Sequence, residues 1–134
     1  MEPIRQEDKL GCAVACVAFI LNIDYKKALK LFASGERKAK DEGFYCKEII
    51  MAFNNLGFGY QYKYTKKRLQ KKIYKENTIV FIKRCKRYPK GHYLTRFNNK
   101  WMDPWINFPK ANIRAGFRKR LPGTPIYLVF QTKD

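Results

Sequence analysis

The chain has 134 residues, and 46% of them are hydrophobic, which excludes a disordered chain and suffices for one packed core. Its 29 Lys and Arg against 11 Asp and Glu give a formal net charge of +18, which disfavours basic partners and attracts polyanions such as nucleic acid, anionic lipid or an acidic protein. A solvated basic surface explains the same charge, so it speaks to partners and not to fold.

The cysteines at positions 12, 16, 46 and 85 are expected to be reduced thiols. The N-terminus lacks the basic start, apolar run and small-residue cleavage site of a secretory signal, so we expect a cytoplasmic chain in a reducing compartment. The longest apolar run covers residues 12–21, whereas a membrane span needs about twenty residues, so we expect no transmembrane segment. The small, lysine-rich chain also suits a phage or bacterial mobile-element protein, with virion association as an alternative location.

The chain begins with a polar stretch and then a strongly apolar one. Residues 1–10 are expected to form an extended arm, and Gly11 lets the chain turn after it. Residues 12–21 are apolar on every face, which predicts a helix that is buried all round.

Two amphipathic helices are predicted next. Asp24 is expected to cap a helix over residues 24–32, whose apolar side chains recur on one face. A charged loop over residues 34–43 leads to a helix over residues 45–56, and Gly57 follows at a position that favours a left-handed backbone.

The second half of the chain has the signals of strands. Residues 60–64 alternate tyrosine with polar residues, and Thr65 is expected to cap a short basic helix that contains Leu69 and Ile73. Further strands are predicted at the β-branched residues 78–83, in a hairpin of residues 92–97 and 100–103 that turns at two asparagines, and at residues 126–131. Little periodicity is visible between residues 104 and 125. Helices followed by a mostly antiparallel sheet make an α+β fold.

Four residues in this pattern suit thiol chemistry. Cys12 opens the buried helix, where unpaired backbone N–H groups and the helix dipole stabilise a thiolate. His92, the only histidine, opens a predicted strand, and Asp103 ends the neighbouring one, where Pro104 keeps it extended. Asp103 is therefore expected to orient the imidazole, and the Gln6 amide, with the Cys12 N–H, to donate to a developing oxyanion. Each residue alone also has an ordinary structural explanation. Their occurrence together, in this order, raises the odds that they act as a functional site.

The same positions resemble a known family. Residues 6–18, QEDKLGCAVACVA, are similar to the nucleophile motif of the bacteriocin-processing double-glycine peptidases, which are papain-like cysteine proteases. Residues 91–93, GHY, resemble that family's histidine followed by an aromatic residue, and residues 102–104, MDP, resemble its Asp-Pro. The stretch 43–56 resembles the helix between the two halves of the family's fold. Only the short motifs are specific.

The resemblance implies a single papain-like peptidase domain over residues 1–134 that acts on a polypeptide. It implies Cys12 as nucleophile, His92 as base, Asp103 as orienting acid and Gln6 in the oxyanion hole. Ala13 departs from the pattern, because the family usually has glycine after its nucleophile, and a methyl group there would narrow the approach to the oxyanion hole. The family's transporter segment is absent from this sequence, and its Gly-Gly leader substrates are not carried over.

Other interpretations remain open at the level of sequence. The same groups would support deamidation or acyl transfer. A catalytically inactive, peptidase-like module would instead bind nucleic acid or an acidic protein through its basic surface, with tyrosines at 60, 62 and 64 as stacking surfaces or as core. Its basic residues fall in three groups: Lys66, Lys67, Arg68, Lys71 and Lys72; Lys83, Arg84, Lys86 and Arg87; and residues 118–120.

A metal site is a third interpretation. Cys12 and Cys16 are four residues apart, and the other cysteines and the histidine are distant in sequence, which does not match the paired, short-spaced ligands of zinc sites. We therefore expect no metal and no cofactor. The sequence gives no oligomeric state.

Overall fold

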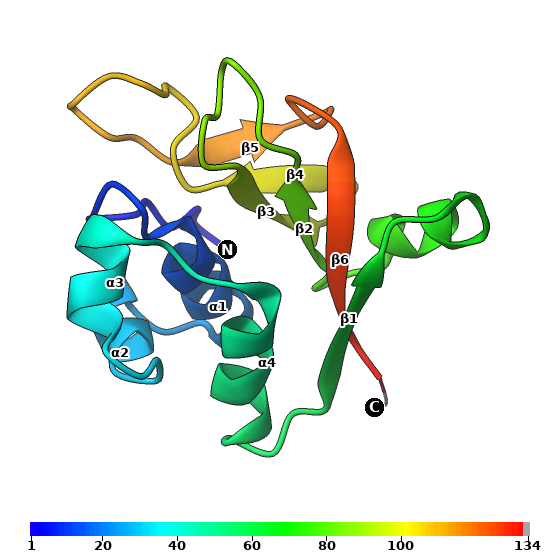
Figure 1. The fold of residues 1–134 in the computed structure, drawn as a ribbon, viewed down its shortest axis with the longest axis horizontal. Helices are drawn as coiled ribbons and strands as arrows, with labels where there is room; N and C mark the ends of the chain where they lie inside the picture. Colours follow the sequence, from blue (N-terminus) through cyan, green and yellow to red (C-terminus); the bar gives the residue numbers. More distant parts are fainter. Residues whose placement is uncertain (133–134) are drawn as a thin grey trace.

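The computed structural model describes residues 1–132, with four α-helices before a six-stranded sheet (Figure 1). The helices are α1 (Cys12–Leu21), α2 (Tyr25–Leu29), α3 (Gly35–Asp41), α4 (Cys46–Asn54) and the 3₁₀ helix η1 (Lys67–Tyr74). The strands are β1 (Tyr60–Tyr64), β2 (Ile79–Ile82), β3 (His92–Phe97), β4 (Lys100–Asp103), β5 (Gly116–Arg118) and β6 (Pro125–Gln131). The predicted α+β class is confirmed.

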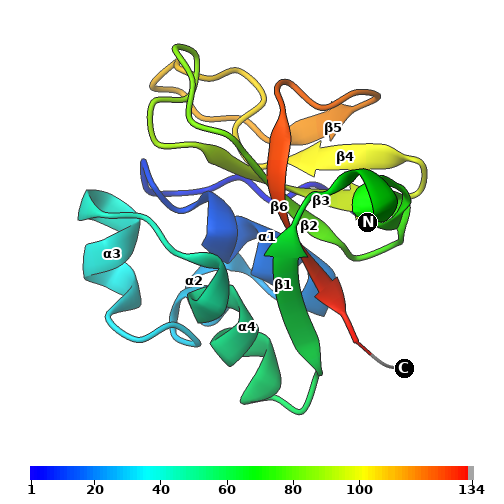
Figure 2. The ribbon, with the colours of Figure 1, turned by 45° about the vertical axis from the view of Figure 1, so that its right-hand side comes forward.

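The six strands form one antiparallel sheet in the order β1-β6-β2-β3-β4-β5. The last strand lies inside the sheet, because β6 pairs with β1 on one side and with β2 on the other (Figure 2). The predicted β3–β4 hairpin is present, and Asn98 and Asn99 both adopt positive φ angles, 49° and 64°. Such angles suit a tight turn whose twist matches that of the strands.

Helix α1 is apolar on every side because the core surrounds it. Residues 13–19 are all buried, and the helix packs against β3, α2 and α4. It ends at Asn22, whose left-handed backbone lets its N–H bond the carbonyls of Ala18 and Phe19. This packing holds the first residue of the helix, Cys12, in a fixed place beside the sheet.

The sheet has an apolar cluster on each face, since side chains alternate along a strand. On the face that α1 and α4 cover, the buried strand residues include Tyr60, Ile79, Tyr93, Met102 and Val129. On the opposite face they include Val80, Ile82, Leu94, Trp101 and Leu128, joined by Ile73 of η1 and by Tyr88. Both faces of the sheet are therefore packed.

Several local predictions were wrong. The charged stretch 34–43 contains helix α3, because Ala39 is buried against the rest of the fold and Lys38 bonds Glu48 of α4 at 2.6 Å. Helix α2 is shorter than predicted, although Asp24 does cap it by accepting the Lys27 N–H. Gly57 has the expected positive φ.

Thr65 does not cap the basic segment. Lys66 occupies the N-cap position of η1 without a side-chain cap bond, and Thr65 Oγ1 is buried without a partner in the described chain. Strand β5 lies in a stretch where no element was predicted, since three residues are too few to show periodicity. None of the helices within residues 1–132 has the length and apolar character needed to cross a bilayer.

Candidate active site

Cys12 is the first residue of α1, and its side chain is partly exposed. Gly11, at the N-cap, supplies no capping side chain, so the first N–H groups of the helix stay available. Glycine is required there by packing, because a Cβ would overlap the Tyr25 hydroxyl, which donates to Asp8 Oδ2 at 2.9 Å. The sulfur thus lies at the positive end of a buried helix.

His92 lies at the start of β3 and is buried, with its Nε2 2.7 Å from Asp103 Oδ1 at the end of β4. The hairpin register pairs Thr95 with Met102, which puts His92 and Asp103 on the same face of the sheet. Because Nε2 donates to the carboxylate, Nδ1 is the nitrogen that remains for Cys12. Asp103 is thus hydrogen-bonded directly to the imidazole that it was predicted to orient.

Asp103 is completely buried, and three donors surround its carboxylate. His92 and the backbone N–H of Trp105 bond Oδ1, the latter at 2.9 Å, and Arg118 Nε donates to Oδ2 at 2.6 Å. A second guanidinium nitrogen of Arg118 donates to the Ile106 carbonyl at 3.1 Å. A buried carboxylate with this many donors remains ionised and fixed in orientation.

The pKa values of the pair follow from this arrangement. Burial alone would lower the pKa of His92, but hydrogen bonds to Asp103 and Cys12 and the charges of both groups raise it to about 9. Burial alone would raise the pKa of Asp103, but the hydrogen bond and charge of His92 and the hydrogen bonds of Arg118 and the Trp105 N–H lower it below its usual value. The arrangement therefore favours the protonated imidazole between the carboxylate and the cysteine.

Gln6 is buried beside the same site, and its backbone N–H bonds the Pro104 carbonyl at 3.1 Å. Its side-chain Nε2 donates to the carbonyls of Asp8 and Lys9, each at 2.9 Å, whereas Oε1 is buried without a partner in the described chain. Both amide hydrogens are therefore committed to the turn before α1. Donation to an oxyanion would require one of these bonds to be exchanged.

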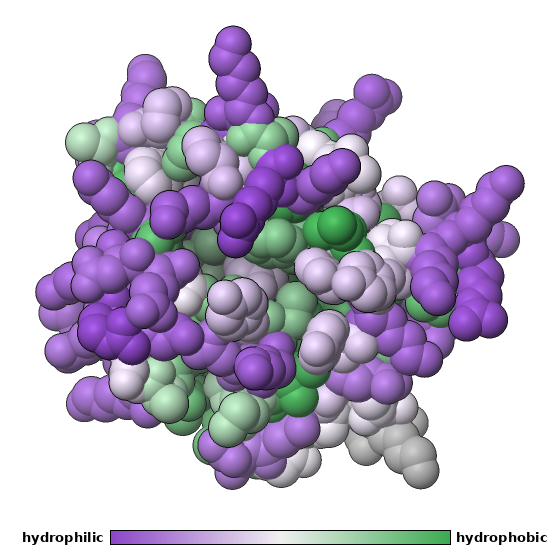
Figure 3. All heavy atoms as spheres, in the orientation of Figure 1, coloured by the Kyte–Doolittle hydropathy of each residue, from purple (hydrophilic) through white to green (hydrophobic). Residues whose placement is uncertain are grey.

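Cys12, His92 and Gln6 open onto one cleft of about 1450 Å³ between the helices and the sheet. Pockets for small molecules usually measure about 300–1,000 Å³. This cleft is larger, so it has room for a peptide chain. In the space-filling view, less hydrophilic residues gather in the middle of this face and hydrophilic side chains surround them (Figure 3). Asp103 does not line the cleft, since it lies behind the imidazole.

Solved structures with the same architecture exist. The peptidase domain of Streptococcus ComA, a bi-functional ABC transporter involved in a quorum sensing pathway, matches with a TM-score of 0.53 and 18% identity, covering 96% of each chain. The peptidase domain of Streptococcus mutans ComA matches with a TM-score of 0.54 and 19% identity, covering 99% of this chain and 100% of that one. No protein-family model and no curated protein sequence matches the chain.

The fold is that of a papain-like peptidase domain. The match runs over nearly the whole length of both chains, whereas the resemblance in the sequence was specific only in short motifs. It confirms the predicted fold class and the resemblance at the level of fold.

Ala13, which departs from the motif of papain-like double-glycine peptidases, is completely buried in the core. It is not among the residues that line the cleft. Its methyl group therefore packs inside the protein, and does not narrow the side from which a substrate approaches Cys12.

Two residues of the candidate site were missed from the sequence. Arg118 was grouped with the basic residues 118–120, but its side chain turns inward to Asp103 and is only 21% exposed. Tyr88 stacks on the His92 ring, with centroids 4.7 Å apart and planes 4° from parallel. Neither has a motif: Arg118 lies among other basic residues, and Tyr88 lies in a loop.

The other cysteines differ from Cys12 in their surroundings. Burial raises the pKa of the Cys16 thiol well above its usual value and that of Cys46 to about 11. Cys85 is exposed on the loop between β2 and β3. Within residues 1–132, no three His, Cys, Asp or Glu side chains are grouped so as to hold a metal ion.

Proposed function

We propose that residues 1–134 form one peptidase domain that cleaves a peptide or amide bond by thiol catalysis. The observation that carries this proposal is the arrangement of Cys12 and His92 on one cleft, with the buried Asp103 hydrogen-bonded to the far nitrogen of the imidazole. An uncharged hydrogen-bonding residue at position 103 would orient the ring but would not hold its positive charge. The similar fold of the two ComA peptidase domains supports the proposal.

In the first step the Cys12 sulfur attacks the substrate carbonyl carbon while His92 is protonated. The charge that develops on the carbonyl oxygen is stabilised by the Cys12 backbone N–H and, once it exchanges a bond, by the Gln6 amide. As the tetrahedral intermediate collapses, the carbon–nitrogen bond breaks and His92 Nδ1 gives its proton to the leaving amine. An acyl group is then bonded to the sulfur.

In the second step His92 is the base. It takes a proton from water, and the resulting hydroxide attacks the thioester carbonyl. The carbon–sulfur bond breaks, the acid leaves, and Cys12 is free for the next substrate, with the proton from water on His92. With an amine in place of water the same groups transfer the acyl chain, and with a side-chain amide as substrate they deamidate.

Hydrolysis of a peptide library by the full chain tests the proposal. We expect cleavage by the wild-type protein and by Cys85→Ala, which removes the other exposed thiol, and no cleavage by Cys12→Ala. Mass spectrometry of a trapped acyl-enzyme would locate the thioester. Cleavage that survives Cys12→Ala would contradict the proposal.

One observation favours a second function, that of an inactive module that only binds its polypeptide or nucleic-acid partner. Both Gln6 amide hydrogens are donated to the carbonyls of Asp8 and Lys9, so the oxyanion donor is occupied. If this arrangement persists with a ligand bound, Cys12 would still be alkylated by iodoacetamide, whereas turnover of any substrate would be slowed by a factor on the order of 10². Alkylation and cleavage measured on the same preparation separate the two functions.

A further inference from the structure

The cleft has an aromatic wall that consists of the part of the sheet left uncovered by the helices. On β1, Tyr60 is buried and stacks on Phe53 of α4, whereas Tyr62 and Tyr64 on the same face are 44% and 58% exposed. The wall continues across β6, β2 and β3 through Tyr127, Phe81 and Tyr93. A wall of this kind binds apolar side chains of a ligand by burying their surface.

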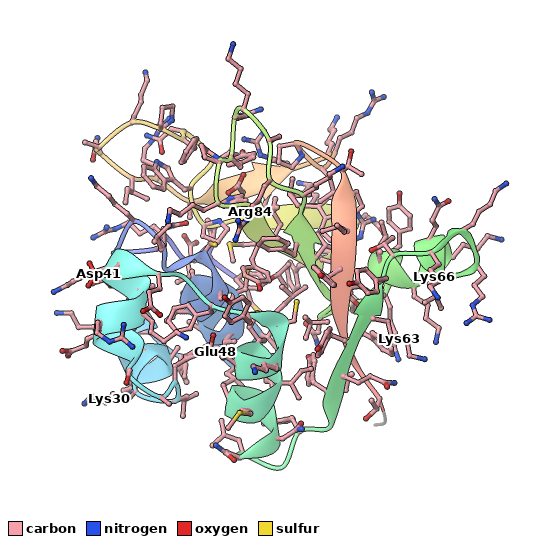
Figure 4. All side chains as sticks on the ribbon, viewed as in Figure 1. Lys30, Asp41, Glu48, Lys63, Lys66 and Arg84 are labelled. Atoms are coloured by element: carbon pink, nitrogen blue, oxygen red, sulfur yellow. The ribbon has the colours of Figure 1, made fainter. Side chains whose placement is uncertain are left out.

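The other side chains around the cleft are mainly basic. Five cations line it, all exposed and none with an ion-pair partner among the described residues: Lys9, Lys47, Lys83, Arg84 and Lys90. Two carboxylates, Asp41 and Glu42, line it as well, and Glu42 is already paired with Arg37 at 2.6 Å. Figure 4 shows Arg84 over the middle of this face, between the helices and the sheet, and Asp41 on α3 at its side.

We infer that the cleft selects an acidic, amphipathic peptide, with apolar side chains on the aromatic wall and carboxylates toward the five cations. This inference rests on the proposed function, because it names the substrate class of the same site. A cleft lined mainly by one sign of charge focuses its field and raises the local concentration of ligands of opposite charge. The net charge of +18 of the whole chain acts in the same direction.

The aromatic wall favours a peptide over nucleic acid as the ligand of the cleft. Base stacking needs open ring faces. Tyr64 packs on Tyr127 with centroids 4.8 Å apart and planes at 33°, and Tyr62 meets Tyr127 edge-on at 70°. The Tyr64 and Tyr127 rings therefore partly cover each other's faces, and the three rings together present a surface that suits aliphatic and aromatic side chains.

Binding is measured with a fluorescein-labelled peptide that alternates glutamate and leucine, and with the matched peptide in which glutamine replaces every glutamate. The protein is the full chain carrying Cys12→Ala, so that no peptide is consumed. We expect the acidic peptide to bind at least about tenfold more tightly at low salt, and the preference to fall as salt is added.

Variants locate the interaction. Lys83→Glu with Arg84→Glu is expected to abolish the preference for the acidic peptide. Lys75→Glu with Lys100→Glu makes the same change in net charge near the Asn98 turn. This turn lies six residues along the chain from His92, which is about 20 Å at roughly 3.3 Å per residue. These two exposed lysines do not line the cleft, so the preference should remain in this control.

The outcomes separate this inference from the proposed function. Cleavage of acidic and glutamine peptides with equal kcat/KM would overturn the inference while the peptidase function stood. A preference in binding without cleavage of any peptide would leave the inference standing while the peptidase function failed. Equal binding of both peptides, with a single-stranded oligonucleotide bound more tightly and released by Lys66→Glu with Lys67→Glu, would overturn it in favour of nucleic acid on η1.

Discussion

Arg118 Nε donates to Asp103 Oδ2 at 2.6 Å, so a strand that pairs with β4 supplies a permanent cation to the carboxylate that orients His92. The guanidinium also bonds the Ile106 carbonyl, which fixes its plane. The carboxylate is thereby held between two positive groups, and its orientation does not depend on His92 alone.

Replacing Arg118 tests this arrangement. Arg118→Ala leaves a fully buried carboxylate with one charged donor fewer, so the free energy of unfolding should fall by about 2 kcal/mol. The pKa of Asp103 lies below its usual value of 3.8, so its stabilisation is present above that pH and is lost as the pH falls through the lower, folded value. Without Arg118 that folded pKa rises, and acid unfolding should begin at higher pH. Urea unfolding at several pH values measures both effects.

The matched control is Arg120→Ala, which removes an exposed arginine two residues away. It should leave both the unfolding free energy and the acid transition close to wild type. Arg118→Lys keeps the charge but cannot bond Asp103 and Ile106 together, and should be intermediate. Equal stability of Arg118→Ala and Arg120→Ala would show that the bond to Asp103 contributes nothing.

The raised pKa of His92 sets an alkaline limit on activity. If the protonated imidazole donates to the leaving amine, kcat/KM should fall as the pH rises through about 9, where His92 loses its proton. Asp103→Asn removes the charge and weakens the bond that raise this pKa, so the fall should move to lower pH. Asp24→Asn, a change of the same kind at the cap of α2, should leave the profile unmoved. A limit that is identical in all three proteins would contradict this account.

The same shift bears on stability. The folded pKa of His92, about 9, lies above its usual value of 6.5, so its stabilisation is complete below pH 6.5 and is lost as the pH rises through about 9. We expect the free energy of unfolding to fall across that interval. In His92→Gln, urea titrations at pH values on both sides of the interval should show a smaller fall. An equal fall would assign it to other groups.

Reactivity of the cysteines provides a further test. Iodoacetamide should leave Cys16 and Cys46 unmodified near neutral pH, because both are buried with raised pKa values. Cys12 and Cys85 are accessible, and only Cys12 has an imidazole beside it. His92→Gln should therefore slow the modification of Cys12 and leave that of Cys85 unchanged, as peptide mapping by mass spectrometry would measure. Equal slowing at both positions would point to a general change in structure.

Replacing Gln6 distinguishes an effect on turnover from an effect on the reactivity of the Cys12 sulfur. If its amide donates to the oxyanion during catalysis, Gln6→Ala should lower kcat by a factor on the order of 10². Alkylation of Cys12 has no oxyanion, so its rate should stay near wild type. Because Gln6 also bonds two carbonyls of the turn before α1, the melting temperature must be measured alongside. A loss of kcat matched by an equal loss of alkylation would indicate a displaced helix instead.

The periodicity of apolar residues in the sequence predicted those helices and strands that bury a regular face. Helix α1 has the predicted bounds because most of its apolar run is buried. Strand β1 was predicted from the alternation of tyrosine with polar residues, and the β3–β4 hairpin from its two turn asparagines. Helix α3 was missed because its seven residues bury little besides Ala39, and the ion pair of Lys38 with Glu48 of α4 supports it. Propensity alone does not record such contacts.

The candidate site also contains residues that the sequence could predict and residues that it could not. Cys12, His92, Asp103 and Gln6 could be proposed as site residues because they lie in motifs or at the ends of predicted elements. Arg118 was read as a surface charge, since its burial depends on how β5 pairs with β4, and no local pattern encodes that pairing. The Gln6 amide bonds depend on the conformation of a turn, which side-chain identity does not specify.

The turn at Asn98 and Asn99 determines which side chain meets the imidazole, although it lies at the other end of the hairpin. Adding one residue to β4 beyond this turn would send the Asp103 carboxylate to the opposite side of the sheet, toward α1, and bring a neighbour with no charge to His92. Length changes in this connection should therefore be tolerated only where they leave the pairing of Thr95 with Met102 intact. Loop lengths vary freely at many places on protein surfaces, but here a change in length would remove the contact between Asp103 and His92.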